Sequence, residues 1–159
     1  MIARIGQCLA ACIVALGAAA APARAAMEPD IVLAEVRKAE QQCREMDGRP
    51  HKGPNFLRVQ DLNGDGGEDW VLDFAKMDCA GAPHPFCGSG GCSLQIYFWA
   101  GGGRWSLVLD ELVQAYRFTG SGTARRLRVK LGGSACGRVN AASCDRTYRL
   151  ERARVVPAR

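Results

Sequence analysis

The sequence of 159 residues lacks several motifs that would identify a common enzyme class. It contains no G-x-x-x-x-G-K-[ST] segment, so a P-loop for phosphate is excluded. It has no C-x-x-C pair, which argues against a thiol oxidoreductase and against a zinc site. Its two histidines, His51 and His84, each lie beside a proline in loop-like sequence. These absences leave little support for catalysis.

The first 25 residues have the three regions of a secretory signal peptide. Arg4 lies in a basic n-region, an apolar run follows from Ile5 to about Ala21, and Ala23-Arg24-Ala25 is a small-residue cleavage site. We therefore expect residues 1–25 to be removed on export. Residues 26–159 would then form a single domain that is periplasmic or secreted.

Two other interpretations of the N-terminal segment are open. An uncleaved membrane anchor is disfavoured because the run is rich in alanine and is followed by Pro22. Lipidation of Cys12, in the lipobox-like Leu9-Ala10-Ala11-Cys12, is disfavoured because cleavage there would leave too short an apolar region. After the signal is removed, no apolar run is long enough to span a bilayer.

Cysteine is the most informative residue type in the rest of the chain. Two of the eight cysteines lie in the predicted signal, which leaves six, an even number. An even number in a small exported protein predicts three disulfides, because an oxidising compartment forms and keeps them. Six cysteines allow 15 pairings, and the sequence does not choose among them. The pairing that we predict is Cys43 with Cys79, Cys87 with Cys92, and Cys136 with Cys144.

One amphipathic helix is predicted near the start of the mature chain, from Pro29 to Met46. Pro29 suits a first helical turn, and Gly48 with Pro50 provides a stop signal. Steps of three and four residues place the apolar side chains on one stripe. These side chains are Val32, Val36, Ala39, Cys43 and Met46.

The chain after Gly53 reads as short strands joined by turns. Alternating apolar and polar residues predict strands at 56–60 and 70–74, and Gly101-Gly102-Gly103 predicts the turn of a hairpin over 93–110. The remaining strands are expected near 116–119, 127–131 and 147–151. The predicted fold class is α+β and mostly β: an N-terminal amphipathic helix packed on a largely antiparallel, disulfide-stapled sheet of about seven short strands.

Charge is distributed unevenly along the chain. The full chain carries +5, whereas residues 26–116 hold 8 basic and 14 acidic side chains and residues 117–159 hold 11 basic and 2 acidic ones. A basic segment of this kind is either a solvated sheet face that partly neutralises the acidic half, or a surface for an acidic partner. The candidate partner-binding residues are Arg126, Arg128, Lys130 and Arg149, with Tyr116 beside them.

Residues 61–70, DLNGDGGEDW, have the spacing of a metal-binding loop. Oxygen-bearing groups recur at alternate positions, and Gly64 and Gly66 allow the tight backbone curl that would aim them at one point. A hard cation such as Ca²⁺ requires six to eight oxygen ligands. The candidate metal ligands are Asp61, Asn63, Asp65, the backbone carbonyl of Gly67, and Asp69, directly or through water.

This loop departs from the EF-hand, which requires a glutamate where Leu72 stands and helices where strands are predicted here. Asp61 to Trp70 instead resembles the aspartate-rich calcium loops of the FG-GAP and VCBS families. The resemblance implies a weak structural Ca²⁺ site between two strands. The single copy does not imply the propeller fold of those families. The wider layout, with the Cys87 to Cys92 segment after the loop, also resembles small exported proteins of proteobacteria.

The alternative for this loop is a polar hairpin turn without a metal, because Asn-Gly and Asp-Gly are strong turn formers. The sequence as a whole favours an exported, non-enzymatic β module with a structural calcium loop. Its basic face would bind an acidic envelope component (a lipid headgroup, a polysaccharide or a protein), and no nucleic acid is expected. The alternative function is a small periplasmic hydrolase or hydrolase inhibitor, for which Ser134 offers an incomplete nucleophile elbow.

Overall fold

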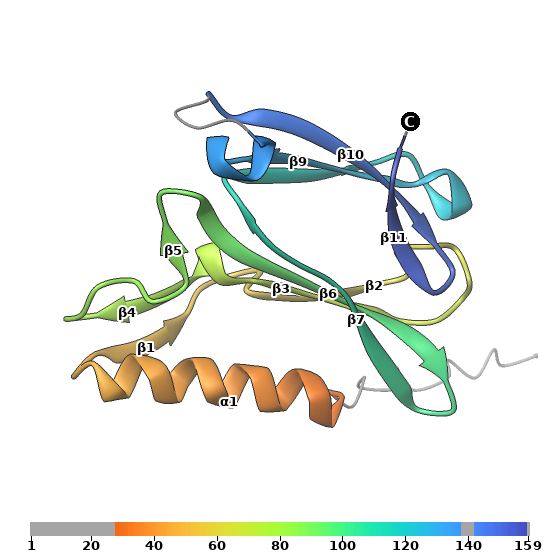
Figure 1. The fold of residues 1–159 in the computed structure, drawn as a ribbon. Coiled ribbons are helices and arrows are strands. Elements are labelled where there is room, and N and C mark those ends of the chain that lie inside the picture. The colour runs from red at the N-terminus through yellow and green to blue at the C-terminus, as the bar shows by residue number, and fades with distance from the viewer. Residues whose placement is uncertain (1–27, 138–141, 159) are drawn as a thin grey trace, which may run out of the picture.

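The computed structural model describes residues 28–137 and 142–158, so the predicted signal peptide lies outside the described residues. Within these residues the chain forms one α-helix, α1 (Asp30–Glu45), and eleven strands (Figure 1). The strands are β1 (Arg49–Lys52), β2 (Leu57–Gln60), β3 (Asp69–Asp73), β4 (Met77–Ala80), β5 (Cys87–Gly88), β6 (Gly91–Gly101), β7 (Arg104–Val113), β8 (Ala115–Thr119), β9 (Arg126–Leu131), β10 (Cys144–Glu151) and β11 (Arg154–Pro157). Three 3₁₀ turns, η1 (Phe74–Lys76), η2 (Gly122–Ala124) and η3 (Gly133–Cys136), complete the described elements.

The strands form three antiparallel sheets among the described residues, and the predicted single sheet of about seven strands is wrong. A central sheet has the order β2-β3-β6-β5, with β7 also paired to β6; β11-β10-β9-β8 form a second sheet, and β1-β4 a small third one. The chain leaves the central sheet at Gln114, between β7 and β8, and enters the second sheet directly. Because β1, β4, β5 and β11 have four residues or fewer, they are too short to show a periodic pattern.

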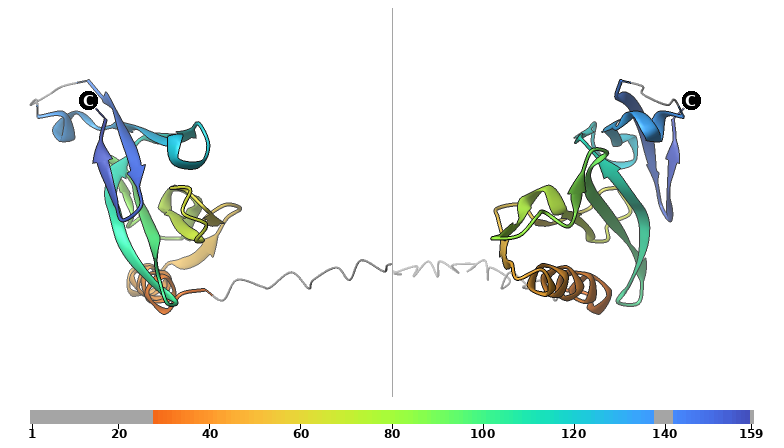
Figure 2. Two further views of the ribbon diagram at one scale, coloured as in Figure 1. Left: turned by 90° about the vertical axis from the view of Figure 1, so that its right-hand side faces the viewer. Right: turned by 60° about the vertical axis from the view of Figure 1, so that its left-hand side comes forward.

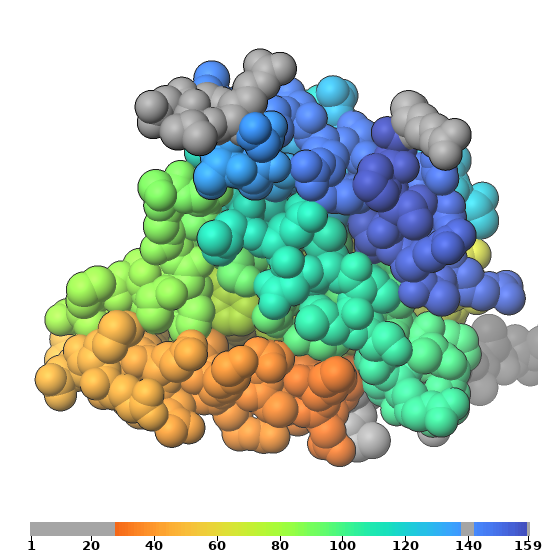
Figure 3. All heavy atoms as spheres, in the orientation of Figure 1, coloured from red at the N-terminus to blue at the C-terminus, as the bar shows by residue number. Residues whose placement is uncertain are grey.

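Helix and sheets stack in layers, with α1 below the central sheet and the β8–β11 sheet above it (Figures 1 and 2). The space-filling view shows the same order, with α1 along the lower edge and the C-terminal strands along the top (Figure 3). The fold is therefore mostly β with one helix on a sheet, as the sequence predicts, but the sheet that receives the helix is itself covered on its other face.

Two apolar clusters share the central sheet. Val71, Ile96 and Phe98 belong to the cluster that faces the β8–β11 sheet. Trp70 and Leu72 belong to the cluster that faces α1. All five residues of β3, DWVLD, are consequently buried. Burial on both faces anchors each end of β3, including the aspartates that bound it.

Helix α1 buries the predicted stripe with one exception. Val32, Val36 and Ala39 are buried in the cluster that faces the central sheet, and Cys43 is buried beside its disulfide partner Cys79 on β4. Met46 lies just beyond the helix as its C-cap residue and is 37% exposed, so its predicted place on the stripe is wrong. The helix ends one turn before the stop signal, and Met46 turns away with the backbone.

The described residues form three disulfides, and their pairing is the one predicted from the sequence. Cys43–Cys79 joins α1 to β4, and Cys87–Cys92 links the paired strands β5 and β6. Cys136–Cys144 joins η3 to the start of β10. Each bond ties a short or peripheral element to a neighbour, which restricts the unfolded chain most where the core contributes least.

Gly48 gives a direct test of packing at the Cys43–Cys79 disulfide. A Cβ at this position would clash with the Sγ atom of Cys79 and lie 2.9 Å from that of Cys43. We expect Gly48→Ala to lower the free energy of unfolding by about 1–3 kcal/mol, the usual cost of overpacking. Gly88→Ala is the control, because a Cβ there meets nothing within 4 Å. Denaturant titration measures both, and equal midpoints for the two variants would contradict the prediction.

Candidate functional site

The acidic loop, residues 61–69, connects the antiparallel strands β2 and β3, as predicted. Gly64 and Gly66 have φ angles of 78° and 84°, which few other residues adopt without strain. The loop therefore curls tightly enough to bring its alternate side chains back onto its own backbone.

Side-chain oxygens hold the curl of the acidic loop. The Asp61 carboxylate accepts hydrogen bonds from the N–H groups of Gly64 and Gly66, at 2.6 and 3.0 Å. The Asn63 side-chain oxygen accepts from the Asp65 N–H at 3.0 Å, and the Asp65 carboxylate accepts from the Gly67 N–H at 2.8 Å. The Asn63 amide also donates to Asp65 at 3.1 Å. Asn63, Asp65 and Gly67 thus form one connected cluster, while Asp61 holds the same loop through Gly64 and Gly66.

Asp69 has a different place from the other predicted ligands. Its side chain is fully buried, and its two oxygens accept hydrogen bonds from the N–H groups of Leu62 and Trp99, each at 2.9 Å. Burial raises the pKa of Asp69 to about 6, the two N–H donors oppose that rise, and the charges of Asp65 and Asp61 add to it. Asp69 therefore anchors the loop from the interior.

The acidic loop also contacts three other parts of the fold. Arg125, just after η2, donates to the Asp61 carbonyl at 2.6 Å. Asn63 donates to the Arg152 carbonyl in the β10–β11 turn at 3.1 Å, and Trp105 of β7 donates to the Glu68 carbonyl at 2.7 Å. The loop is thus the contact point between the central sheet and the β8–β11 sheet.

The residues of the loop are suited to a hard cation by their chemistry. Asp61, Asn63, Asp65 and the Gly67 carbonyl offer oxygen donors only, the type that Ca²⁺ prefers. Across residues 28–137 and 142–158, no three or more His, Cys, Asp or Glu side chains form a group that could hold a metal ion. The amide and the backbone carbonyl would have to supply part of the ligand set. Calcium binding by this loop stays a prediction.

The second candidate site is the outer face of the β8–β11 sheet, called here the basic face. Residues paired across antiparallel strands point to the same side. Arg128 pairs with Arg117, and Arg126 pairs with Arg149. The opposite face of β9 is buried through Leu127, Val129 and Leu131. The basic face therefore carries the four predicted residues, Arg126, Arg128, Lys130 and Arg149, together with Arg117 and Arg154.

Only part of the basic face is neutralised by acidic neighbours. Arg149 and Arg154 form ion pairs with Glu151 at 3.3 and 2.8 Å. Among the described residues, Arg117, Arg128 and Lys130 have no carboxylate within 4.0 Å, and these side chains line a shallow depression of about 260 Å³ with Asp145 at its edge. Arg117 was not among the predicted partner-binding residues, because only the β8–β9 register brings it beside Arg128.

Tyr116 turns inward and is not part of the basic face. Its hydroxyl donates to the buried carboxylate of Asp73 at 3.0 Å and accepts a hydrogen bond from Arg58. Burial, followed by the negative charge of Asp73, raises the pKa of Tyr116. This chain of contacts connects β2 and β3 to β8, so Tyr116 joins the two sheets and does not present its hydroxyl to a partner.

The residues considered for hydrolysis lie apart in the structure. Ser134 is in η3, His51 is in β1, and the His84 ring contacts Cys87 and accepts from the Phe86 N–H at 3.3 Å. Cys87 is in a disulfide and offers no thiol. The part of the chain that the structure describes shows no hydrogen bond between Ser134 and either histidine, so these positions add nothing to the hydrolase alternative.

Comparison with protein families, with curated proteins and with solved structures found no match to this chain. In the described part of the chain, no helix has the length and apolar character needed to cross a membrane.

The raised pKa of Asp69 predicts an unusual dependence of stability on pH. A carboxyl group whose pKa is higher in the folded state than in the unfolded state costs stability once it ionises. This cost is absent below about pH 4 and is complete above about pH 6. A shift of that size corresponds to roughly 2–3 kcal/mol.

Asp69→Asn isolates this effect in calcium-free buffer, because asparagine does not titrate. We expect the stability of the native protein relative to Asp69→Asn to fall by roughly 2–3 kcal/mol between pH 4 and pH 7. Denaturant titrations at several pH values measure the difference. Asp47→Asn, at an exposed position, is the control and should show a constant difference. A constant difference for Asp69→Asn as well would be evidence against the buried anchor.

Proposed function

We propose that this protein is an exported, non-enzymatic β module that binds an anionic component of the cell envelope through its basic face. The observation that carries the proposal is the register of β8, β9 and β10, which gathers Arg117, Arg128 and Lys130 around one depression. The three disulfides support an oxidising compartment such as the periplasm or the exterior.

The arrangement of the basic face is unfavourable for stability alone. Like charges directly opposite each other on antiparallel strands repel, and Arg117–Arg128 and Arg126–Arg149 are two such pairs. An anionic ligand placed between them would relieve the repulsion. The same register also pairs Lys130 with Asp145 and Arg154 with Glu151, so the repulsion that an anionic ligand would relieve is that of the two arginine pairs.

Internal neutralisation accounts for little of the basic charge. Among the described residues after 116, Arg146 alone forms an ion pair with an acidic residue from the first part of the chain, Glu111, at 3.8 Å. Arg149 and Arg154 pair with Glu151 on their own sheet. The acidic and basic halves of the sequence therefore do not neutralise each other by contact, and the charge of the basic face is directed to solvent.

We also propose that the acidic loop holds Ca²⁺ as a structural ion. Asp61, Asn63, Asp65 and the Gly67 carbonyl would hold it, and Asp69 would support the loop from beneath. The ion would offset the repulsion between carboxylates and tighten the loop. Because the loop contacts Arg125 and the Arg152 carbonyl, a tighter loop would fix the position of the β8–β11 sheet.

The basic face is tested by charge reversal in the double variant Arg128→Glu/Lys130→Glu. We expect the native protein to bind vesicles that contain phosphatidylglycerol, or a soluble anionic polysaccharide such as polygalacturonate. Binding should weaken steeply with added salt, since exposed charges are screened. The double variant should lose binding by at least about ten-fold. Co-sedimentation and titration calorimetry measure this, and the two probes distinguish a lipid from a polysaccharide.

Arg37→Glu/Arg104→Glu is the matched control, because it makes the same change of charge at exposed positions on α1 and β7. The control should bind within about two-fold of the native protein, because its charges lie outside the depression. An equal loss in both double variants would show that net charge alone governs binding. That result, or binding to uncharged vesicles alone, would count against the basic face.

The calcium loop is tested by thermal unfolding with calcium and with chelator. An ion bound at about 10⁻⁴ to 10⁻³ M raises the stability by roughly 1–3 kcal/mol at 10 mM, a rise in Tm of several degrees. Asp61→Asn should abolish most of this rise. Glu68→Gln removes a charge from the same loop at an exposed position that is not a predicted ligand, and it should keep the rise. Equal melting temperatures with calcium and chelator would refute a calcium site.

A further inference from the structure

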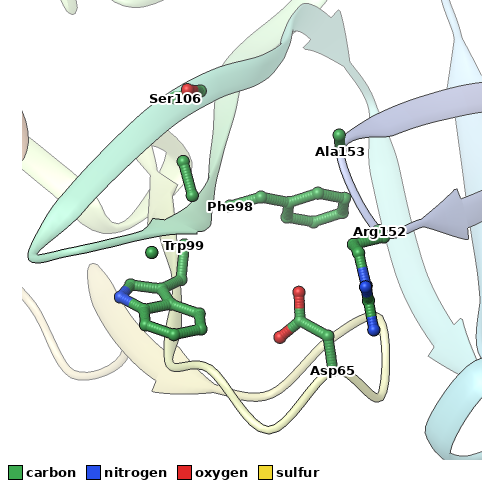
Figure 4. Close-up of a pocket in the computed structure, with 8 residues that line it drawn as sticks. Asp65, Phe98, Trp99, Ser106, Arg152 and Ala153 are labelled. Carbon is green, nitrogen blue, oxygen red and sulfur yellow. The ribbon is translucent and has the colours of Figure 1, made fainter.

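A cavity of about 450 Å³ lies beside the acidic loop, between the β6–β7 hairpin and the β10–β11 turn (Figure 4). Its volume is in the range of small-molecule sites, about 300–1,000 Å³. The cavity is independent of the basic face, and none of its lining residues belongs to that surface. The side chains that define it are Asp65, Phe98, Trp99, Ser106 and Arg152.

The lining combines one partly exposed aromatic ring, that of Trp99, with two opposite charges, whereas Phe98 is only 1% exposed and belongs to the apolar core. Figure 4 shows the Phe98 ring and the Trp99 indole on the walls of the cavity, with the Asp65 carboxylate and the Arg152 guanidinium at its rim. Asp65 and Arg152 are not an ion pair, because no nitrogen–oxygen distance of 4.0 Å or less joins them. The acceptor and the donor therefore stand apart, each available to a ligand between them.

The Trp99 side chain is held in place by its contacts with the acidic loop. Gly67 lies directly against Trp99: a Cβ at Gly67 would come within 2.8 Å of the Trp99 Cβ and Cδ2 atoms. The Trp99 backbone N–H donates to the buried Asp69 carboxylate at 2.9 Å. A ring fixed in this way loses little conformational entropy when a ligand stacks on it.

The pairing of the two strands beside the cavity is irregular. The pairing of β6 with β7 shifts between Trp99 and Gly101, so Ala100 has no partner in the register. Such bulges leave a residue outside the ladder and are common next to binding sites. Ala100 lines the cavity at an exposed position.

We propose that this cavity binds a neutral sugar ring. The apolar face of a pyranose would lie against the Trp99 indole, and its hydroxyl groups would donate to Asp65 and accept from Arg152. A hydroxyl group is both a donor and an acceptor, so it satisfies both neighbours. A ligand with a single charge would be attracted by one of these two side chains and repelled by the other, so its charge gives it no net advantage over a neutral ring.

The cavity is tested with methyl pyranosides of glucose, galactose and mannose, added to the disulfide-bonded protein. Binding is followed by tryptophan fluorescence and by saturation-transfer NMR. We expect saturable binding of at least one pyranoside in the millimolar range, insensitive to added salt because the ligand is neutral. Maltotriose and cellotriose are included because tighter binding of a trisaccharide than of the methyl glycoside indicates a unit of a polymer.

Arg152→Ala is the informative variant, because Arg152 is exposed and its loss should leave the fold intact. Loss of a hydrogen bond to a charged group should weaken sugar binding at least about ten-fold. Arg104→Ala, at an exposed arginine at the start of β7 that does not line the cavity, should bind as the native protein does. Ser106→Ala should weaken binding by a smaller factor.

Asp65 belongs to both the cavity and the proposed calcium loop, so the titrations are run with calcium and with chelator. Sugar binding in either buffer that Arg152→Ala weakens and Arg104→Ala does not supports the cavity, whatever the outcome for calcium. Three results would overturn the proposal: no saturable binding in either buffer, equal binding by Arg152→Ala, or preference for a zwitterion such as phenylalanine over every sugar.

Discussion

The structure depends on one buried carboxylate, that of Asp69 at the start of β3. Its oxygens accept the N–H groups of Leu62 at the entry of the acidic loop and of Trp99 on β6. These two bonds close the loop at its base and fix it to the central sheet. Both donors are backbone groups that would be costly to leave unpaired in the interior. The raised pKa of Asp69 reflects the cost of this anchor, which is placed in the apolar layer shared by both clusters.

The second sheet is held over the first by polar contacts on two sides of an apolar interior. On one side, the acidic loop bonds to Arg125 and to the β10–β11 turn. On the other side, Tyr116 of β8 bonds to Asp73 at the far end of β3. Both aspartates that bound β3 therefore position the β8–β11 sheet, one through the loop and one directly. Apolar burial is non-directional, whereas these hydrogen bonds select one orientation, and that orientation turns the basic face to solvent.

Local sequence patterns correctly predicted the structural features that depend only on residues close together in the sequence. The stripe from Val32 to Cys43 and the alternation of Leu127, Val129 and Leu131 with basic residues were both readable, because helix and strand periods are local. The number of sheets could not be predicted from the sequence, because the chain changes sheet at Gln114 without any turn residue to mark the change. Tyr116 was misplaced because its partner Asp73 lies on a strand distant in sequence, and Arg117 was missed because its neighbour is set by the register of β8 with β9.

The acidic loop shows how one stretch of sequence can serve several purposes that its pattern does not separate. The same aspartate spacing that suggests metal binding also closes side-chain-to-backbone hydrogen bonds, buries an anchor and lines a cavity. A hydrogen bond from N–H uses one lone pair of a carboxylate oxygen and leaves another, so the bonds of Asp61 and Asp65 are compatible with a cation. Asp69 has both oxygens bonded in the interior and no exposed surface, so a cation at the loop would act on Asp69 through its field. That field would lower the cost of ionising Asp69 near neutral pH, so an ion at the surface of the loop and the charge beneath it would stabilise each other.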